Sequence, residues 1–461
     1  MEEKMKKIVS MLSLALLLNA SQSNTPLSLD EAIELLKQNN LEIKNAQFDI
    51  ETAALDQNLV SGKHWGKLDL VQDIARSNDA GNVFGFKLAS REATFGDFGA
   101  MEFMNSQTST GFPDSAYTTP PQDLNYPEAR NFFQTKLKYE LPIFTGFAIS
   151  SYEEIMAAMQ KMKTLDKEQV VAEQTYQLRK SYYDMALLES SVKNLTTISQ
   201  NISTLENTTK SMIEVGYAKR VDLLEVQAKK GNIERLLVQM DANQKLLYSY
   251  ISFLLNQKVE KIQIPQTEIP TPLYSHEEIL NANLDIKKAA LGLEMRESMQ
   301  DVSKSALYPM VGAFAEASTA DDTFLGDAVD HRAYTVGARA SWNLFNGGID
   351  DAQMQKSQIE QLKTKSQVQL ARLGTALQID KINTEIASFN EEIYFLEQEL
   401  LLANEIYKSY EERYREKLAS MSDVIIKQSE QIEKILQLQM MKNKKNERIF
   451  ALEKLANGEK K

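Results

Sequence analysis

Side chains that could carry out chemistry are sparse in this sequence. The three histidines, His64, His276 and His331, are far apart and have no carboxylate or histidine partner at a metal-ligand spacing. The sequence contains no cysteine, no glycine-rich phosphate loop and no nucleophile motif. We therefore expect no enzymatic activity, no metal site, no disulfide and no cofactor.

The charge balance excludes another class of function. The chain has 64 acidic and 52 basic residues, which gives a formal net charge of -12. A protein that binds nucleic acid would present a basic face to the phosphate backbone. We expect no nucleic-acid partner, and we interpret most of the charge as solvated surface.

Two stretches, residues 134–147 and 335–348, have the alternation of a β-strand and lead into long polar sequences. In each stretch apolar side chains fall on one face and polar or charged ones on the other, as a period of two requires. Each ends in a Phe-polar-Gly motif, which we interpret as a strand-to-helix junction. The junction residues are Phe144, Gly146, Phe345 and Gly347.

The two junctions reveal an internal duplication. They lie 201 positions apart, and the same offset pairs identical residues downstream, including Ala218 with Ala419 and Asp222 with Asp423. Upstream, residues 40–44 resemble residues 283–287 at a larger offset of 243. The first copy therefore holds the longer connection between its strands, which we place at residues 80–130 and predict to be a long loop.

The sequence thus divides into five segments. We predict a signal peptide, a first repeat, a linker that could form a collar, a second repeat and a short tail, at residues 1–20, 24–258, 259–273, 274–457 and 458–461. The first segment has three early lysines, then the apolar run 8–18, then small and polar residues, which is typical of a secretory signal. That run is shorter than the roughly 20 residues that span a bilayer.

Long helices follow each junction. No proline interrupts residues 143–264 or the chain after Pro309, so helices of about 65 to 70 residues are permitted there. The pattern breaks near residues 216 and 418, and helices return over 222–255 and 423–455, which predicts two helical hairpins. Each repeat also opens with a predicted helix, over 27–60 and 276–305, the first with Ser28 and Glu31 as a capping box.

Each repeat contributes one β-hairpin, because residues 67–75 and 309–318 also read as strands. The fold class is therefore mixed α and β, with four strands per chain. Four strands with one apolar and one polar face cannot bury either face alone. In a membrane such strands must join a closed barrel, because an open edge leaves backbone groups unpaired.

The order of these elements resembles the TolC-like outer-membrane efflux protein family. The resemblance rests on the junctions LPIFTG and WNLFNG, on the turns VGYAKRVDLLEVQ and KLASMSDVIIKQ, and on the duplication. It implies a homotrimer in which three chains complete a 12-stranded outer-membrane β-barrel, continued by a long periplasmic α-helical barrel. The implied function is the outer-membrane channel of a tripartite efflux or type I secretion system.

The resemblance also implies two sites at the helical turns. A periplasmic gate would use Tyr414, Asp222 and Asp423, and adaptor-docking tips would use Gly216, Ala218 and Ala419. The family's gate arginine and second gate aspartate correspond to Ala419 and Ile426, so the closing bonds must differ. Arg220, Arg413 and Arg415 are candidates for them. Two alternatives stay open: the aspartates could be N-caps of the returning helices, and Gly216 a turn glycine with positive φ.

The implied partners are a periplasmic adaptor (membrane fusion) protein, an inner-membrane pump and outer-membrane lipid. The implied location is the outer membrane with a large periplasmic portion, after cleavage of the signal peptide. Drug, metal and protein export all remain open as cargo classes. An exported coiled-coil structural or adhesion protein is the alternative; it would account for the helices and the signal peptide but not for the strands.

Overall fold

The computed structural model describes residues 26–265, 269–324, 326 and 329–457, so the predicted signal peptide and tail lie outside the described residues. The chain forms two compact units. The helical unit comprises Met1–Glu51, Met162–Ala290 and Ser366–Lys461, and the sheet unit comprises Thr52–Lys161 and Leu291–Lys365. Both units draw on both repeats, because the long helices run from one unit into the other.

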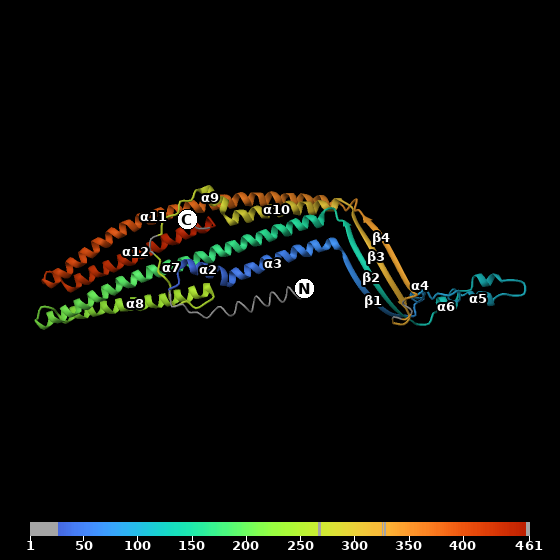
Figure 1. The fold of residues 1–461 in the computed structure, drawn as a ribbon, viewed down its shortest axis with the longest axis horizontal. Helices are drawn as coiled ribbons and strands as arrows, with labels where there is room; N and C mark the ends of the chain where they lie inside the picture. Colours follow the sequence, from blue (N-terminus) through green and yellow to red (C-terminus); the bar gives the residue numbers. More distant parts are fainter. Residues whose placement is uncertain (1–25, 266–268, 325, 327–328, 458–461) are drawn as a thin grey trace. The chain divides into compact units, whose positions relative to one another are not determined.

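Four long helices confirm the predicted hairpins. The first hairpin is α7 (Ala148–Glu214) with α8 (Arg220–Leu255), and the second is α11 (Ile349–Arg415) with α12 (Met421–Leu455) (Figure 1). Helices α7 and α11 each contain 67 residues, as expected for duplicated elements. Among the described residues, none of the helices combines the length and the apolar character needed to cross a bilayer.

The core of the helical unit places α7 between two neighbours. Leu178, Tyr182 and Met185 of α7 pack with Ile251 and Leu254 of α8. On another side, α7 contacts the end of α12, which belongs to the second repeat. Helix α11 packs with α12 in the same way that α7 packs with α8, through Ile379, Ile382 and Ile386.

The prediction of one continuous helix at the start of each repeat was wrong. The structure divides each into two, α2 (Leu29–Asn39) with α3 (Leu41–Ser61), and α9 (His276–Ala282) with α10 (Leu284–Lys304). The predicted capping box of Ser28 and Glu31 is confirmed at the start of α2.

A buried asparagine causes each break. The Asn40 side-chain oxygen accepts hydrogen bonds from the N–H groups of Glu42 and Ile43, at 2.9 and 3.1 Å, and its amide donates to the Leu254 carbonyl at 2.9 Å. Asn283 does the same in the second repeat, accepting from Ile286 and donating to Leu455. Each asparagine therefore starts a new helix and also binds a carbonyl that the end of the returning helix leaves unpaired.

The sheet unit contains one antiparallel sheet in the order β1-β2-β3-β4. Its strands are β1 (Lys67–Ser77), β2 (Arg130–Phe144), β3 (Met310–Asp321) and β4 (Arg332–Ser341). The register aligns residues of the four strands in rows across the sheet, and apolar and charged rows lie next to each other. One row reads Leu68, Tyr139, Ala315 and Val336, and the adjacent one reads Asp69, Lys138, Glu316 and Thr335. Successive rows face opposite sides of a sheet, so one face is apolar and the other charged.

Residues 80–130, predicted as a long loop, contain regular structure instead. The segment includes α4 (Ala80–Ala89), α5 (Ala100–Asn105) and α6 (Gln122–Asn125), with short 3₁₀ turns at Gly96–Phe98 and Asp114–Tyr117. The prediction failed because the phenylalanines of this segment, which were interpreted as part of a loop composition, form ring contacts. Phe86 stacks on Phe132 at 4.1 Å, and Phe103 stacks on Phe112 at 4.4 Å between ring centroids.

Candidate functional site

The turns of the two helical hairpins adopt the same backbone conformation. Gly216 has φ +76°, and the N–H of Tyr217 donates to the Met212 carbonyl at 2.7 Å. In the second turn Lys417 has φ +67°, and the N–H of Leu418 donates to the Arg413 carbonyl at 2.7 Å. These are the hydrogen bonds of a helix C-terminus closed by a left-handed residue. The alternative that Gly216 is a turn glycine with positive φ is therefore confirmed.

The small residues beside these turns leave room for another molecule. A side chain built at Gly216 would meet no atom within 4 Å, so the backbone angle, and not crowding, favours glycine there. Ala218 and Ala419 are half-buried at equivalent positions directly before the returning helices. Docking of an adaptor on these residues stays a prediction.

The two aspartates lie one turn inside the returning helices. Lys219 and Ser420 occupy the N-cap positions, so the alternative that Asp222 and Asp423 are N-caps was wrong. Asp222 accepts from the Lys219 N–H at 2.7 Å; Asp423 accepts from the Ser420 N–H and hydroxyl at 3.0 and 2.6 Å. The Ser420 hydroxyl and N–H hold the pKa of Asp423 below its usual range. Both carboxylates therefore stabilise the N-termini of the returning helices, whether or not they also form a gate.

Tyr414 is buried in the core that α7, α8, α11 and α12 share near the turns. Burial raises the pKa of its hydroxyl, Thr209 beside it acts in the opposite direction, and the negative charge of Asp222 raises it further. The structure thus brings Tyr414 and Asp222 into electrostatic reach of each other. The positive charges of Arg413 and Lys427 instead lower the pKa of Asp423 further.

Sequence reasoning missed the contact that joins the two turns. The ammonium nitrogen of Lys417 lies 3.1 Å from the ring centroid of Tyr217, a cation–π contact between the second hairpin and the first. Two of the candidate closing arginines contact their own helix: Arg413 lies over Tyr410, and Arg415 pairs with Glu411. The signal available in the sequence was Lys417, because it stands at a position of the turn where glycine is usual.

The junction residues lie in the sheet unit. Gly146 has φ +61°, and a side chain there would approach the Ser305 carbonyl oxygen to 2.5 Å, so glycine is required. Phe144 packs edge-on against Phe147 at 5.2 Å. In the second repeat Gly347 also has positive φ but has open space around it, and Phe345 is exposed. The junctions share their backbone conformation but not their packing.

Comparison with known proteins agrees with this geometry. The model of the family described as outer membrane efflux protein matches residues 276–458, the second repeat. Three channel structures have similar folds over most of the chain. They are VceC of Vibrio cholerae (TM-score 0.73, 14% identity, 93% of this chain and 96% of that one), CmeC of Campylobacter jejuni (0.71, 13%, 96% and 90%) and MtrE of Neisseria gonorrhoeae (0.70, 11%, 93% and 89%).

Over its second repeat the chain matches the outer membrane efflux protein family, and over most of its length it has the fold of these solved proteins. No curated protein sequence matches it. VceC is described as an outer membrane protein, and CmeC and MtrE as outer membrane channels. The similarity confirms the predicted fold class of long helices with a four-stranded antiparallel sheet.

Proposed function

We propose that this protein is the outer-membrane channel of a tripartite efflux or secretion system and acts as a closed homotrimer. The observation that carries the proposal is that a single chain leaves complementary surfaces uncovered. Within the part of the chain that the structure describes, strands β1 and β4 each have one neighbour in the sheet, and the leucines of one sheet face are exposed, including Leu68 and Leu70. A barrel closed between copies would pair both edges, and its apolar face would contact lipid.

The helical unit supports the same assembly. Helix α11 exposes a line of large apolar side chains at helical spacing: Leu370, Leu373, Leu377, Phe395 and Leu402. Helix α8 exposes another: Val221, Leu224, Val238, Leu246 and Phe253. Two different surfaces on one chain form a heterologous interface, which closes into a ring when the rotation between copies permits it.

The internal duplication indicates how these two helices meet. Within one chain, α12 of the second repeat packs on α7 of the first through Arg179 with Glu453 and Tyr183 with Phe450. The repeat counterparts of α12 and α7 are α8 and α11. We infer that α8 of one copy packs on α11 of the next as α12 packs on α7, so that twelve helices alternate around the ring.

The periplasmic adaptor and the inner-membrane pump enter this proposal through the hairpin turns. Replacing both Ala218 and Ala419 by arginine should abolish export while the trimer still forms, because bulky charged side chains would block close approach of another helical hairpin. Export is measured as accumulation of a fluorescent cargo in cells, and assembly as trimer mass by light scattering. A matched arginine substitution at the exposed Asn232, further along α8, should leave export intact. Normal export by the double variant would contradict a docking role.

The gate also belongs to the proposal. In a trimer Asp222 and Asp423 would each form a ring of three carboxylates, which would attract cations to the opening. Replacing Asp423 by Ala should weaken block by a polyvalent cation added on the periplasmic side of a planar bilayer. Ser420→Ala is the matched control, since it removes the cap but keeps the charge.

Replacing Tyr414 by Ala should raise conductance, because it removes packing that joins the hairpins. Unchanged block and conductance would place the gate elsewhere.

A further inference from the structure

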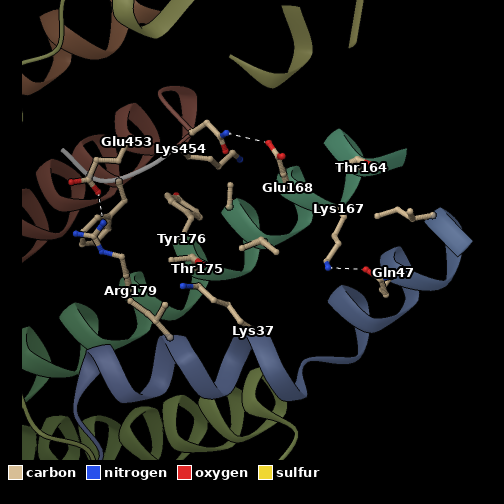
Figure 2. Close-up of a pocket in the computed structure, with 16 residues that line it drawn as sticks. Lys37, Gln47, Thr164, Lys167, Glu168, Thr175, Tyr176, Arg179, Glu453 and Lys454 are labelled. Atoms are coloured by element: carbon tan, nitrogen blue, oxygen red, sulfur yellow. Dashed lines mark hydrogen bonds and ion pairs between the residues drawn. The ribbon is translucent and has the colours of Figure 1, made fainter. Parts of the chain in front are cut away.

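A cavity of about 730 Å³, with both apolar and charged side chains in its walls, lies within the helical unit. Figure 2 shows its walls, which come from α2, α3, one face of α7 and the end of α12. Its volume is in the range of pockets that bind small organic molecules. Nothing in the proposed channel function requires a cavity at this place.

The position of the cavity keeps it open in the assembly proposed above. Helix α7 is flanked by α8 on one side and by α12 on the other, both from the same chain. Copies that meet through α8 and α11 would not cover the face of α7 that carries Lys167, Val171 and Tyr176. The cavity therefore belongs to each copy alone, and a trimer would contain three.

The duplication supplies an internal comparison. The cavity residues Lys37, Ala172, Tyr176 and Lys454 correspond in the other repeat to Leu280, Leu373, Leu377 and Phe253. Large apolar side chains at those four places would pack together once the next copy docks. At these four places the counterparts are more apolar than the cavity residues. Other lining positions differ in the opposite sense, since Val171 and Ile33 correspond to Arg372 and His276. The duplicated fold does not require the hollow, whereas a bound ligand would account for it.

The charges around the cavity favour an anion. Arg179 is already neutralised by Glu453, with 2.6 Å between guanidinium nitrogen and carboxylate oxygen. The ammonium of Lys167 is different, because it donates to the neutral side-chain oxygen of Gln47 at 2.8 Å (Figure 2). Lys37 pairs with Glu34, which does not line the cavity. Exposed pairs of that kind contribute little to stability, so Lys37 can exchange Glu34 for another anion.

The remaining lining suits an apolar body with a polar end. Ile33, Val171, Ala172 and Phe450 supply apolar surface. Burial raises the pKa of Tyr176 to about 12, and Glu447 and Glu173 act in the same direction, so its hydroxyl stays protonated and can donate. The carboxylate of Glu168, bonded to the Asn457 amide at 3.5 Å, lies at the exposed end. It would disfavour anions that carry more than one charge.

We propose that this cavity binds an organic monoanion with an apolar body, held by the ammonium groups of Lys167 and Lys37. The inference goes beyond the channel function. It rests on the proposed assembly for the statement that neighbouring copies leave the cavity open, but binding can be measured whether or not the protein conducts. The chemistry fits a transported compound or a cellular regulator equally. Blocking the cavity should therefore alter conductance only if the ligand is a regulator.

The test uses the full chain in lipid nanodiscs and calorimetry with three probes of one shape: 2-naphthoate, 2-naphthylmethanol and 2-naphthylmethylammonium. We expect the anion to bind at least tenfold more tightly than the other two. Lys167→Gln should weaken naphthoate binding about tenfold, and Lys258→Gln, at an exposed lysine outside the cavity, should not change it. Equal binding of the three probes, or no binding of naphthoate, would overturn the proposal.

A second variant copies the apolar counterpart into the cavity. Lys37→Leu, Ala172→Leu, Tyr176→Leu and Lys454→Phe together should abolish naphthoate binding and leave the conductance of the ligand-free channel unchanged. If this variant fails to assemble, Ala172→Leu alone narrows the cavity and should reduce binding more than Lys258→Gln does. Full naphthoate binding by an assembled variant would show that the probe binds elsewhere and would contradict the assignment.

Discussion

Cysteines placed at residues 238 and 391 should link three chains into one closed trimer. The chain has no native cysteine, so only the introduced thiols can react with the linking reagent. Val238 and Glu391 are the repeat counterparts of Gln439 and Ser190, whose side chains lie 3.4 Å apart within one chain. If α8 of one copy packs on α11 of the next, a short bismaleimide should convert most of the protein to a species three chains in mass.

The duplication provides the matched control for this experiment. Cysteines at 439 and 190 should react with the same reagent inside one chain and leave the denatured mass at one chain. Cysteine at 238 alone should give no linkage. A ladder extending beyond three chains would indicate an open array in place of a ring, and a purely monomeric product would contradict the proposed interface.

Replacing Glu453 by Gln should cause a large loss of stability in the helical unit. The Arg179 and Glu453 side chains are 9% and 8% exposed, and the guanidinium also lies 4.7 Å from the Phe450 ring centroid. Removing one partner of a buried pair leaves an uncompensated charge, which costs about 3 to 5 kcal/mol. Amide hydrogen exchange should report this as lost protection at the end of α12.

Two further variants separate the buried charge from simple loss of a contact. Replacing both Arg179 and Glu453 by Met should recover much of the protection, because apolar side chains of similar size need no counter-charge. Lys258→Ala breaks a pair that is 76% and 67% exposed and should reduce the protection far less than Glu453→Gln does. Equal losses for Glu453→Gln and Lys258→Ala would show that the buried pair has no special role.

The sequence predicted those elements whose signal is local and periodic. Alternation identified the strands, and the absence of proline with a steady apolar stripe identified the 67-residue helices. The break at Asn40 was missed because asparagine is tolerated inside a helix. Only the carbonyl of Leu254, more than two hundred positions away, makes the break favourable. Its recurrence at Asn283 was visible in the duplication and was the available clue.

The site could be predicted only in part. Asp222 and Asp423 were placed correctly near the turns, but their position inside the helix follows from Ser420 and Lys219 as N-caps. The pattern Ser420-x-x-Asp423 could have shown this for the second turn. The Lys417–Tyr217 contact and the cavity depend on which helices become neighbours. Spacing along one chain does not contain that information.

The helix breaks at Asn40 and Asn283 also affect how the length of such a chain can change during evolution. Helix α8 ends beside the start of α3, but the two are not consecutive in the chain, and Asn40 joins them through a side chain. Residues inserted in equal number on both sides of the Gly216 turn would lengthen the α7–α8 hairpin without rotating α3. Asn283 gives the second repeat the same freedom. Matched insertions in both hairpins could therefore adjust the reach of the helices while the rest of each repeat keeps its register.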